Sequence, residues 1–310
     1  MQLTNRRVRL MGTVIDVSIY HKEPEPLLDQ VEALLHTYNK RFSANDDSSE
    51  LMKINKAAGL HPVTVHPELF ELISLGKWHS CQPGSHLNIA IGPLIQTWRI
   101  GFSDARLPLP EEIAPLLDII NPKDIVLSEE NQSVFLKEKG MKIDLGALAK
   151  GYIADRIADY LKDENVTSAL INLGGNVLTF GPALHNPDQK WRIGIQNPKE
   201  TRNTNLMVLA IRDKSVVTSG IYERTFEIDG KTYHHIFDSQ TGYPVSSDLA
   251  SLTIISSLSV DGEIWTTRLF GSSLEHIFQE VSSQAELEAI IVDKDNHCFQ
   301  TGGIYKMRIS

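Results

Sequence analysis

The stretch that decides the fold covers residues 144–177 and reads DLGALAKGYIADRIADYLKDENVTSALINLGGNV. It combines a loop, a helical pattern and a strand pattern that ends in two glycines. Apolar side chains recur after the loop at three- or four-residue spacing and predict a helix with one apolar stripe, made of Leu148, Ala149, Ile153, Ile157 and Leu161. Residues 167–173 have the alternation and β-branching of a buried strand.

The same stretch offers groups that bind anions. Its loop leads into the start of the helix, and Gly174-Gly175 ends the strand. This arrangement puts free backbone N–H groups near one carboxylate, Asp144, and one ammonium, Lys150. Helix N-termini and glycine turns accept anionic ligands, phosphates in particular. The alternative interpretation, that Asp-Leu-Gly is only a helix cap, stays open from this stretch alone.

Composition limits the classes of protein to consider. The chain has 310 residues, of which 41% are hydrophobic and 22% charged, as is ordinary for a soluble globular protein. The net charge of -9 argues against a nucleic-acid partner but leaves room for a small phosphorylated ligand. Two cysteines make no disulfide framework, and no apolar run is long enough to span a membrane. We therefore expect a cytoplasmic protein.

The remaining strand patterns come in antiparallel pairs. Asp229-Gly230 predicts a hairpin turn between two extended runs, and residues 294–296 predict another. Residues 125–135 and 141–143 have the pattern of further antiparallel strands. Residues 8–20 have the alternation of a single strand, in which Gly12 indicates a bulge or a close approach. Because helices are grouped between these pairs, the pattern favours an α+β fold over a doubly wound parallel sheet.

A second stretch with candidate chemistry is HHIFDSQTGYP at residues 234–244. Two adjacent histidines on a strand point to opposite faces, so at most one of His234 and His235 faces a given site. The alternative is an edge strand that ends in a turn and carries two surface histidines.

A third stretch is VDGEIWTTRLFG at residues 260–271. Glu263 and Thr267 are four residues apart, which stacks them on one face of a helix. A carboxylate and a hydroxyl in this arrangement can bind a hard cation such as Mg²⁺ through oxygen. The alternative is a solvated helix start with Asp261 as its cap.

The order and combination of these stretches resemble the ApbE family, the FAD:protein FMN transferases, from residue 11 to about residue 270. The resemblance implies a single domain over residues 1–310 with an α+β, T-fold-like architecture of antiparallel sheets and packed helices. It also implies a Mg²⁺-dependent reaction that transfers the FMN part of FAD to a Thr or Ser hydroxyl of an acceptor protein and releases AMP. The matching blocks are Arg41-Phe42-Ser43, Ser49-Glu50-Leu51 with Asn55, Gly92-Pro93-Leu94 with Trp98, DLGALAKGY at 144–152, Asn172 with Gly174-Gly175, Thr218-Ser219-Gly220, HHIFD and TGYP within 234–244, and the segment around Thr267.

The resemblance also implies roles for particular residues. His235 would assist deprotonation of the acceptor hydroxyl. The metal would be held by the carbonyl of Ala147, by Glu263 and by Thr267, and Asp261 is the alternative or additional carboxylate. The residues that would contact FAD are Met11, Asn45, His86, Leu87, Asn88, Asp144, Lys150 and the backbone of Ile236.

The sequence departs from the family pattern at three places. Asn45 stands where relatives often carry an aromatic residue that can stack on the flavin. Residues 87–90 replace a Phe-Asp-Pro-Thr-like stretch, and Glu263 replaces an aspartate. Two other functions stay open beside the transferase: an FAD pyrophosphatase that gives the FMN to water, and a non-catalytic flavin carrier. The sequence predicts neither the acceptor protein nor the oligomeric state.

Overall fold

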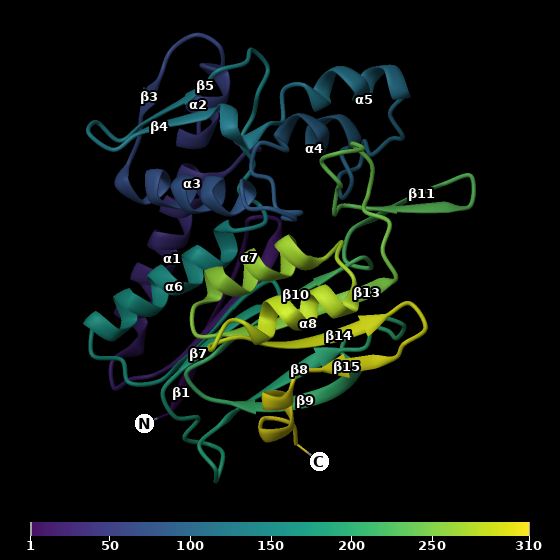
Figure 1. Cartoon of the computed structure of the whole chain (residues 1–310). Helices are drawn as coiled ribbons and strands as arrows, with labels where there is room; N and C mark the ends of the chain where they lie inside the picture. The colour runs from purple at the N-terminus through teal and green to yellow at the C-terminus, as the bar shows by residue number, and fades with distance from the viewer. Residues whose placement is uncertain (1, 310) are drawn as a thin grey trace.

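The computed structural model describes residues 2–309 and is built on an eight-stranded antiparallel sheet (Figure 1). The strand order is β1-β2-β6-β7-β10-β13-β14-β15, and all neighbours in it run antiparallel. The strands are β1 Leu3–Leu10, β2 Thr13–Tyr20, β6 Ala169–Leu173, β7 Asn176–Phe180, β10 Ser215–Gly220, β13 Leu249–Ser256, β14 Glu288–Asp293 and β15 Cys298–Gln300. The antiparallel sheet confirms the α+β prediction.

The two faces of this sheet carry different layers. Along β13 and β14, alternate residues belong to two separate cores, because successive side chains of a strand point to opposite faces. Helices pack on one face: α1 Pro24–Phe42, α6 Ala149–Asp163, α7 Ser259–Leu269 and α8 Leu274–Ser282. The other face is covered by the hairpin of β8 Trp191–Gln196 and β9 Asn205–Ile211, together with the 3-10 helix η2 Gly302–Lys306.

The chain between α1 and α6 forms a second part of the molecule, drawn at the top of Figure 1. Its elements are α2 Glu50–Lys56, β3 Val63–Thr64, α3 Pro67–Ser80, α4 Gly92–Trp98, α5 Pro110–Leu117, η1 Pro122–Asp124, β4 Ile125–Ser128 and β5 Ser133–Leu136. A small core around Trp98 joins this part to the hairpin of β11 Thr225–Ile228 and β12 Lys231–His234. The ring of Tyr233 lies 5.3 Å from that of Trp98.

Two strand predictions are wrong. Residues 8–20 form a hairpin of β1 and β2, in which Met11 and Gly12 make the turn with φ of 54° and 70°. A two-residue turn moves the inward-facing positions from even numbers, such as the partly buried Leu10, to odd numbers, such as Ile15, and a single continuous strand has no such phase shift. Residues 141–143 form no strand but only a parallel bridge between Ile91 and Lys142.

The other hairpin predictions are confirmed. Asp229 and Gly230 have positive φ values of 51° and 71° and join β11 to β12. β14 and β15 are joined at the predicted residues 294–296.

Within residues 2–309, no helix is both long enough and apolar enough to cross a membrane.

Candidate active site

Helices α6 and α7 pack closely where two candidate segments meet. A Cβ added to Gly151 would lie 2.6 Å from the carbonyl oxygen of Ser259, so only glycine allows this approach. Lys150 is the neighbour of Gly151 at the start of α6. The close packing therefore brings the lysine within reach of the side chains on α7.

The centre of the site is the carboxylate of Glu263, whose residue is only 5% exposed. Its Oε1 accepts hydrogen bonds from Lys150 Nζ at 2.8 Å and from Asn176 Nδ2 at 2.9 Å. Asn176 begins β7 directly after the Gly174-Gly175 turn, and its Oδ1 accepts a hydrogen bond from Ser259 Oγ. Three segments that are far apart in the chain thus meet at one carboxylate.

The first turn of α7 is capped from a neighbouring helix. Asp155 on α6 accepts hydrogen bonds from the backbone N–H groups of Ser259, at 2.8 Å, and of Val260, at 2.9 Å. Burial raises the pKa of Asp155 to about 6, although these two N–H groups act in the opposite direction. The alternative in which Asp261 caps this helix is therefore wrong. Asp261 is half-buried, and burial raises the pKa of its carboxyl.

The oxygen atoms expected to hold a metal have no partner within residues 2–309. Glu263 Oε2 and Thr267 Oγ1 make no hydrogen bond there, and neither belongs to the fully buried unsatisfied atoms. The carbonyl of Ala147 receives no backbone hydrogen bond, because the first turn of α6 bonds to Leu145 and Leu148. A carboxylate, a hydroxyl and a carbonyl form a donor set that fits a hard cation such as Mg²⁺.

The two adjacent histidines have different environments. Nδ1 of His235 lies 3.4 Å from the carbonyl oxygen of Arg224, and because a carbonyl only accepts, we assign the ring proton to Nδ1. Burial, with the charges of Arg224 and Lys150, lowers the pKa of His235 to about 4, so the ring is neutral at pH 7. Both ring nitrogens of His234 bond to the backbone, at Val245 and Ile236.

Two further predicted residues lie beside groups of the site. Asp144 Oδ1 accepts a hydrogen bond from Gly146 N at 2.8 Å; burial raises the pKa of this carboxyl, whereas the charge of Arg224 lowers it. Because its hydrogen bond goes to Gly146, the Asp144 carboxylate stabilises its own loop and does not cap α6.

His86 occupies the space left by the missing Cβ of Gly271, and burial lowers the pKa of its ring.

The remaining residues predicted to contact FAD differ in whether their side chains are occupied inside the protein or accessible. Leu87 lies in the main core at 2% exposure, and the side chain of Asn88 bonds to the backbone of Ile120 and Ala90. Only the backbone of these two residues is available to a ligand. Asn45 is exposed. Met11, Ala147 and Ile236 are partly buried against the same core.

Our sequence reasoning missed two residues. Asn176 directly follows the glycine pair that we had singled out. Arg224 could have been found from the hairpin signal, because a two-residue turn at Asp229-Gly230 pairs Thr225 with His234. The next pair outward is then Arg224 with His235.

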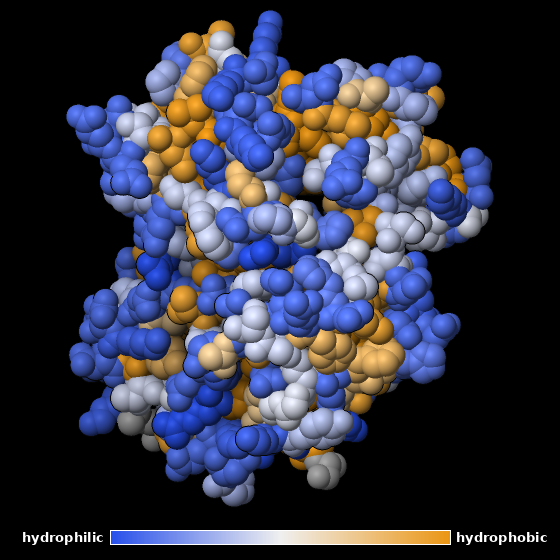
Figure 2. Space-filling model, in the orientation of Figure 1, coloured by the Kyte–Doolittle hydropathy of each residue, from blue (hydrophilic) through white to orange (hydrophobic). Residues whose placement is uncertain are grey.

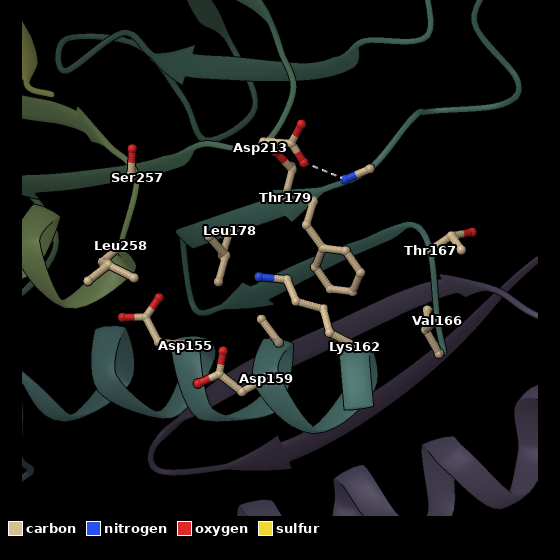
Figure 3. A pocket seen from close by; sticks show the side chains of 13 residues that line it. Asp155, Asp159, Lys162, Val166, Thr167, Leu178, Thr179, Asp213, Ser257 and Leu258 are labelled. Carbon is tan, nitrogen blue, oxygen red and sulfur yellow. Dashed lines mark hydrogen bonds between the residues drawn. The ribbon is translucent and has the colours of Figure 1, made fainter. Parts of the chain in front are cut away.

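A cavity of about 400 Å³ lies elsewhere, between α6 and β7 (Figure 3). It is lined by Asp155, Asp159, Lys162, Phe180 and Asp213 among others, and by none of the predicted site residues. In the space-filling view, the surface is hollowed between the part that carries α4 and α5 and the part that carries α7 and α8 (Figure 2).

Comparison with known proteins shows the family and the fold. The sequence model of the ApbE family matches residues 11–291. The chain belongs to the ApbE family. A relative from Klebsiella pneumoniae, named FAD:protein FMN transferase, is 44% identical over 286 residues, which cover 92% of this chain and 88% of that protein. A protein of the same name from Treponema pallidum is 33% identical over 315 residues and covers 97% of this chain and 87% of its own length.

Solved structures confirm the fold of this ApbE family member. The ApbE protein of Thermotoga maritima superposes with a TM-score of 0.90 at 25% identity over the whole of both chains. The flavin transferase ApbE of Vibrio cholerae superposes with a TM-score of 0.85 at 20% identity over 99% of each chain. The family resemblance found in the sequence is thereby confirmed.

Proposed function

We propose that the chain transfers the FMN part of FAD to a Thr or Ser hydroxyl of an acceptor protein, with Mg²⁺ as its metal, and releases AMP. The observation that carries the proposal is that Lys150 and Asn176 both donate hydrogen bonds to the carboxylate of Glu263. The relatives of the chain are named FAD:protein FMN transferases. In this proposal α6 supplies the cation Lys150, and the loop before α6 together with α7 supplies the oxygen ligands of the metal. Both positive groups would neutralise the charge of a bound pyrophosphate.

The free oxygen atoms indicate which residues would hold the metal. We assign this role to the carbonyl of Ala147, the carboxylate of Glu263 and the hydroxyl of Thr267. When bound, Mg²⁺ stabilises negative charge on the phosphates. Lys150 adds a second positive charge, because its side chain is 28% exposed and can turn from Glu263 toward a phosphate oxygen.

His235 is the base in this proposal. Its Nδ1–H faces the Arg224 carbonyl, so Nε2 carries the lone pair that accepts the proton of the acceptor hydroxyl. The hydroxyl oxygen attacks the phosphorus of the FMN half, the bond from that phosphorus to the oxygen of AMP breaks, and AMP leaves. General base catalysis of this kind typically contributes about 10²–10⁴-fold.

The decisive experiment supplies the purified protein with FAD, MgCl₂ and a panel of purified candidate acceptor proteins. We expect a fluorescent acceptor band that survives denaturation, and AMP in equal amount. FMN and AMP released to water without any acceptor would replace the proposal by a pyrophosphatase. FAD bound tightly but left intact with Mg²⁺ and every acceptor would replace it by a flavin carrier.

We also propose that the reaction takes place in the cytoplasm. The support is that both cysteines are free thiols, Cys81 partly buried and Cys298 exposed. Free exposed thiols persist in reducing compartments. The position of an epitope-tagged full chain after cell fractionation tests this assignment.

A further inference from the structure

Within residues 2–309, the guanidinium of Arg224 has no partner of opposite charge. It lies directly before β11 and is exposed. Among the described residues its guanidinium makes neither an ion pair nor a stacking contact with an aromatic ring. Its neighbour Glu223 is taken by Arg202, whose Nη2 lies 2.9 Å from Glu223 Oε2. The Arg224 head group is therefore available to a ligand.

The base of this side chain is held in place. A Cβ added to Gly101, whose φ is +92°, would lie 3.1 Å from Arg224 Cδ and 3.6 Å from its Cβ. The aliphatic stem of Arg224 thus runs along a position that tolerates only glycine. Its carbonyl oxygen faces Nδ1 of His235 at 3.4 Å, across the hairpin set by Asp229-Gly230.

The charge of Arg224 reaches groups from separate parts of the site. It opposes the rise that burial causes in the pKa of Asp144, in the loop before α6, and it contributes to the lowered pKa of His235, which directly follows β12. Lys150 also acts on His235, but its ammonium already has a partner in Glu263. The charges of Lys150 and Arg224 thus both act on the histidine, and within residues 2–309 Arg224 has no ion-pair partner.

We propose that the Arg224 guanidinium binds the pyrophosphate of FAD beside His235, as a second cation together with Lys150. The inference rests on the proposed function, because it takes FAD as the ligand. A planar guanidinium can donate two parallel hydrogen bonds to one phosphate, which the point charge of a lysine cannot. In that position it also stabilises negative charge that develops on the departing AMP.

The test compares ligands with and without phosphate. Equilibrium dissociation constants for FAD and for riboflavin are measured by flavin fluorescence on wild type, Arg224→Met and Arg224→Lys. Met keeps most of the stem beside Gly101 and removes the charge. We expect Arg224→Met to weaken FAD binding by about tenfold or more, with riboflavin binding unchanged, and Arg224→Lys to recover part of the loss.

Arg192→Met is the control, because it removes one positive charge at an arginine that already pairs with Asp188, and it leaves the pair of Arg202 with Glu223 intact. We expect it to leave both dissociation constants unchanged. The inference is overturned if Arg224→Met leaves FAD binding intact, or if it weakens FAD and riboflavin equally, as a purely structural role would. The proposed function survives either result as long as wild type binds and splits FAD; wild type that binds no FAD would overturn both.

Discussion

Lys150 Nζ and Glu263 Oε1 lie 2.8 Å apart although 113 residues separate them in the chain. The two partners are buried to different degrees, since the lysine side chain is 28% exposed and the glutamate side chain 7%. Glu263 is therefore fixed by the protein, whereas Lys150 can exchange partners. This asymmetry suits a site in which the carboxylate serves a metal and the ammonium turns to a phosphate.

Glu263→Gln should weaken the binding of Mg²⁺ and remove most of the transfer at ordinary Mg²⁺ concentrations. Glutamine has nearly the same shape and can keep a hydrogen bond to Asn176, but it lacks the charge that a hard cation prefers. We expect the Mg²⁺ concentration for half-maximal transfer to rise at least about tenfold. Asp261→Asn is the control. If Asp261→Asn abolishes metal dependence and Glu263→Gln does not, Asp261 is the metal carboxylate.

His235→Ala should keep FAD binding and lose transfer by about 10²–10⁴-fold, because only the proton acceptor is removed. The measurement pairs an FAD dissociation constant with a single-turnover rate. His234→Ala serves as the comparison, since both nitrogens of that ring bond to the backbone. We expect it to lower the melting temperature but to keep the rate per folded molecule. A full rate in His235→Ala would rule out its role as base.

The rate of transfer should not fall near pH 6.5, where an ordinary histidine becomes protonated. Burial, together with the charges of Arg224 and Lys150, lowers the pKa of His235 from 6.5 to about 4. The free base is therefore present above pH 4 and is lost only as the pH falls through that value. We expect kcat/KM to show no acid limb between pH 6 and 7.5. A limb near pH 6.5 that disappears in His235→Gln would contradict this environment.

Asp155→Asn should change the pH dependence of stability. The folded-state pKa of about 6 is above the ordinary value of 3.8 for an aspartate, so the native protein holds more protons than the unfolded chain between these pH values. The contribution of Asp155 to stability is then full below pH 3.8 and is lost as the pH rises through 6. As the pH rises from 4.5 to 7.5, we expect the melting temperature of wild type to fall relative to that of Asp155→Asn. An equal change in melting temperature for wild type and Asp155→Asn over this pH range would contradict the buried environment of this carboxyl.

Gly151→Ala should separate α6 from α7 and so disturb the contact between Lys150 and Glu263. The added Cβ would lie 2.6 Å from a backbone oxygen that cannot move aside alone. We expect a loss of about 1–3 kcal/mol of unfolding free energy, measured by urea denaturation. Gly302→Ala is the control, because nothing lies within 4 Å of its added Cβ. Equal stability of the two variants would show that the helices tolerate the wider spacing.

Much of the fold could be predicted from local signals. Pro67 and Pro110 mark helix starts, and Asp229-Gly230 fixes the register of its hairpin, because these residues restrict the backbone by themselves. The β1–β2 turn was missed because Met11 carries no such signal. Met11 has a positive φ, which a methionine rarely adopts and which its residue type therefore does not predict.

The site was predictable only in part, for a different reason. Motif matches indicated Lys150 and Glu263, but not that they bond to each other. The cap of α7 comes from Asp155, 104 residues away from Ser259, and no local pattern indicates a partner at that distance. Likewise, Leu87 and Asn88 are predicted to contact FAD, yet tertiary packing uses both side chains internally.

The central claim is that segments from α6, the β6–β7 turn and α7 form one site for a divalent ion and a pyrophosphate. A crystal structure of the protein soaked with FAD and Mn²⁺, located by its anomalous signal, tests this most directly. The account predicts the ion at about 2.0–2.3 Å from the Ala147 carbonyl, the Glu263 carboxylate and the Thr267 hydroxyl. An ion bound instead at the exposed turn of Asp293, Asp295 and His297, whose ligand atoms lie within 4.8 Å of one another, with no ion at Glu263, would contradict it.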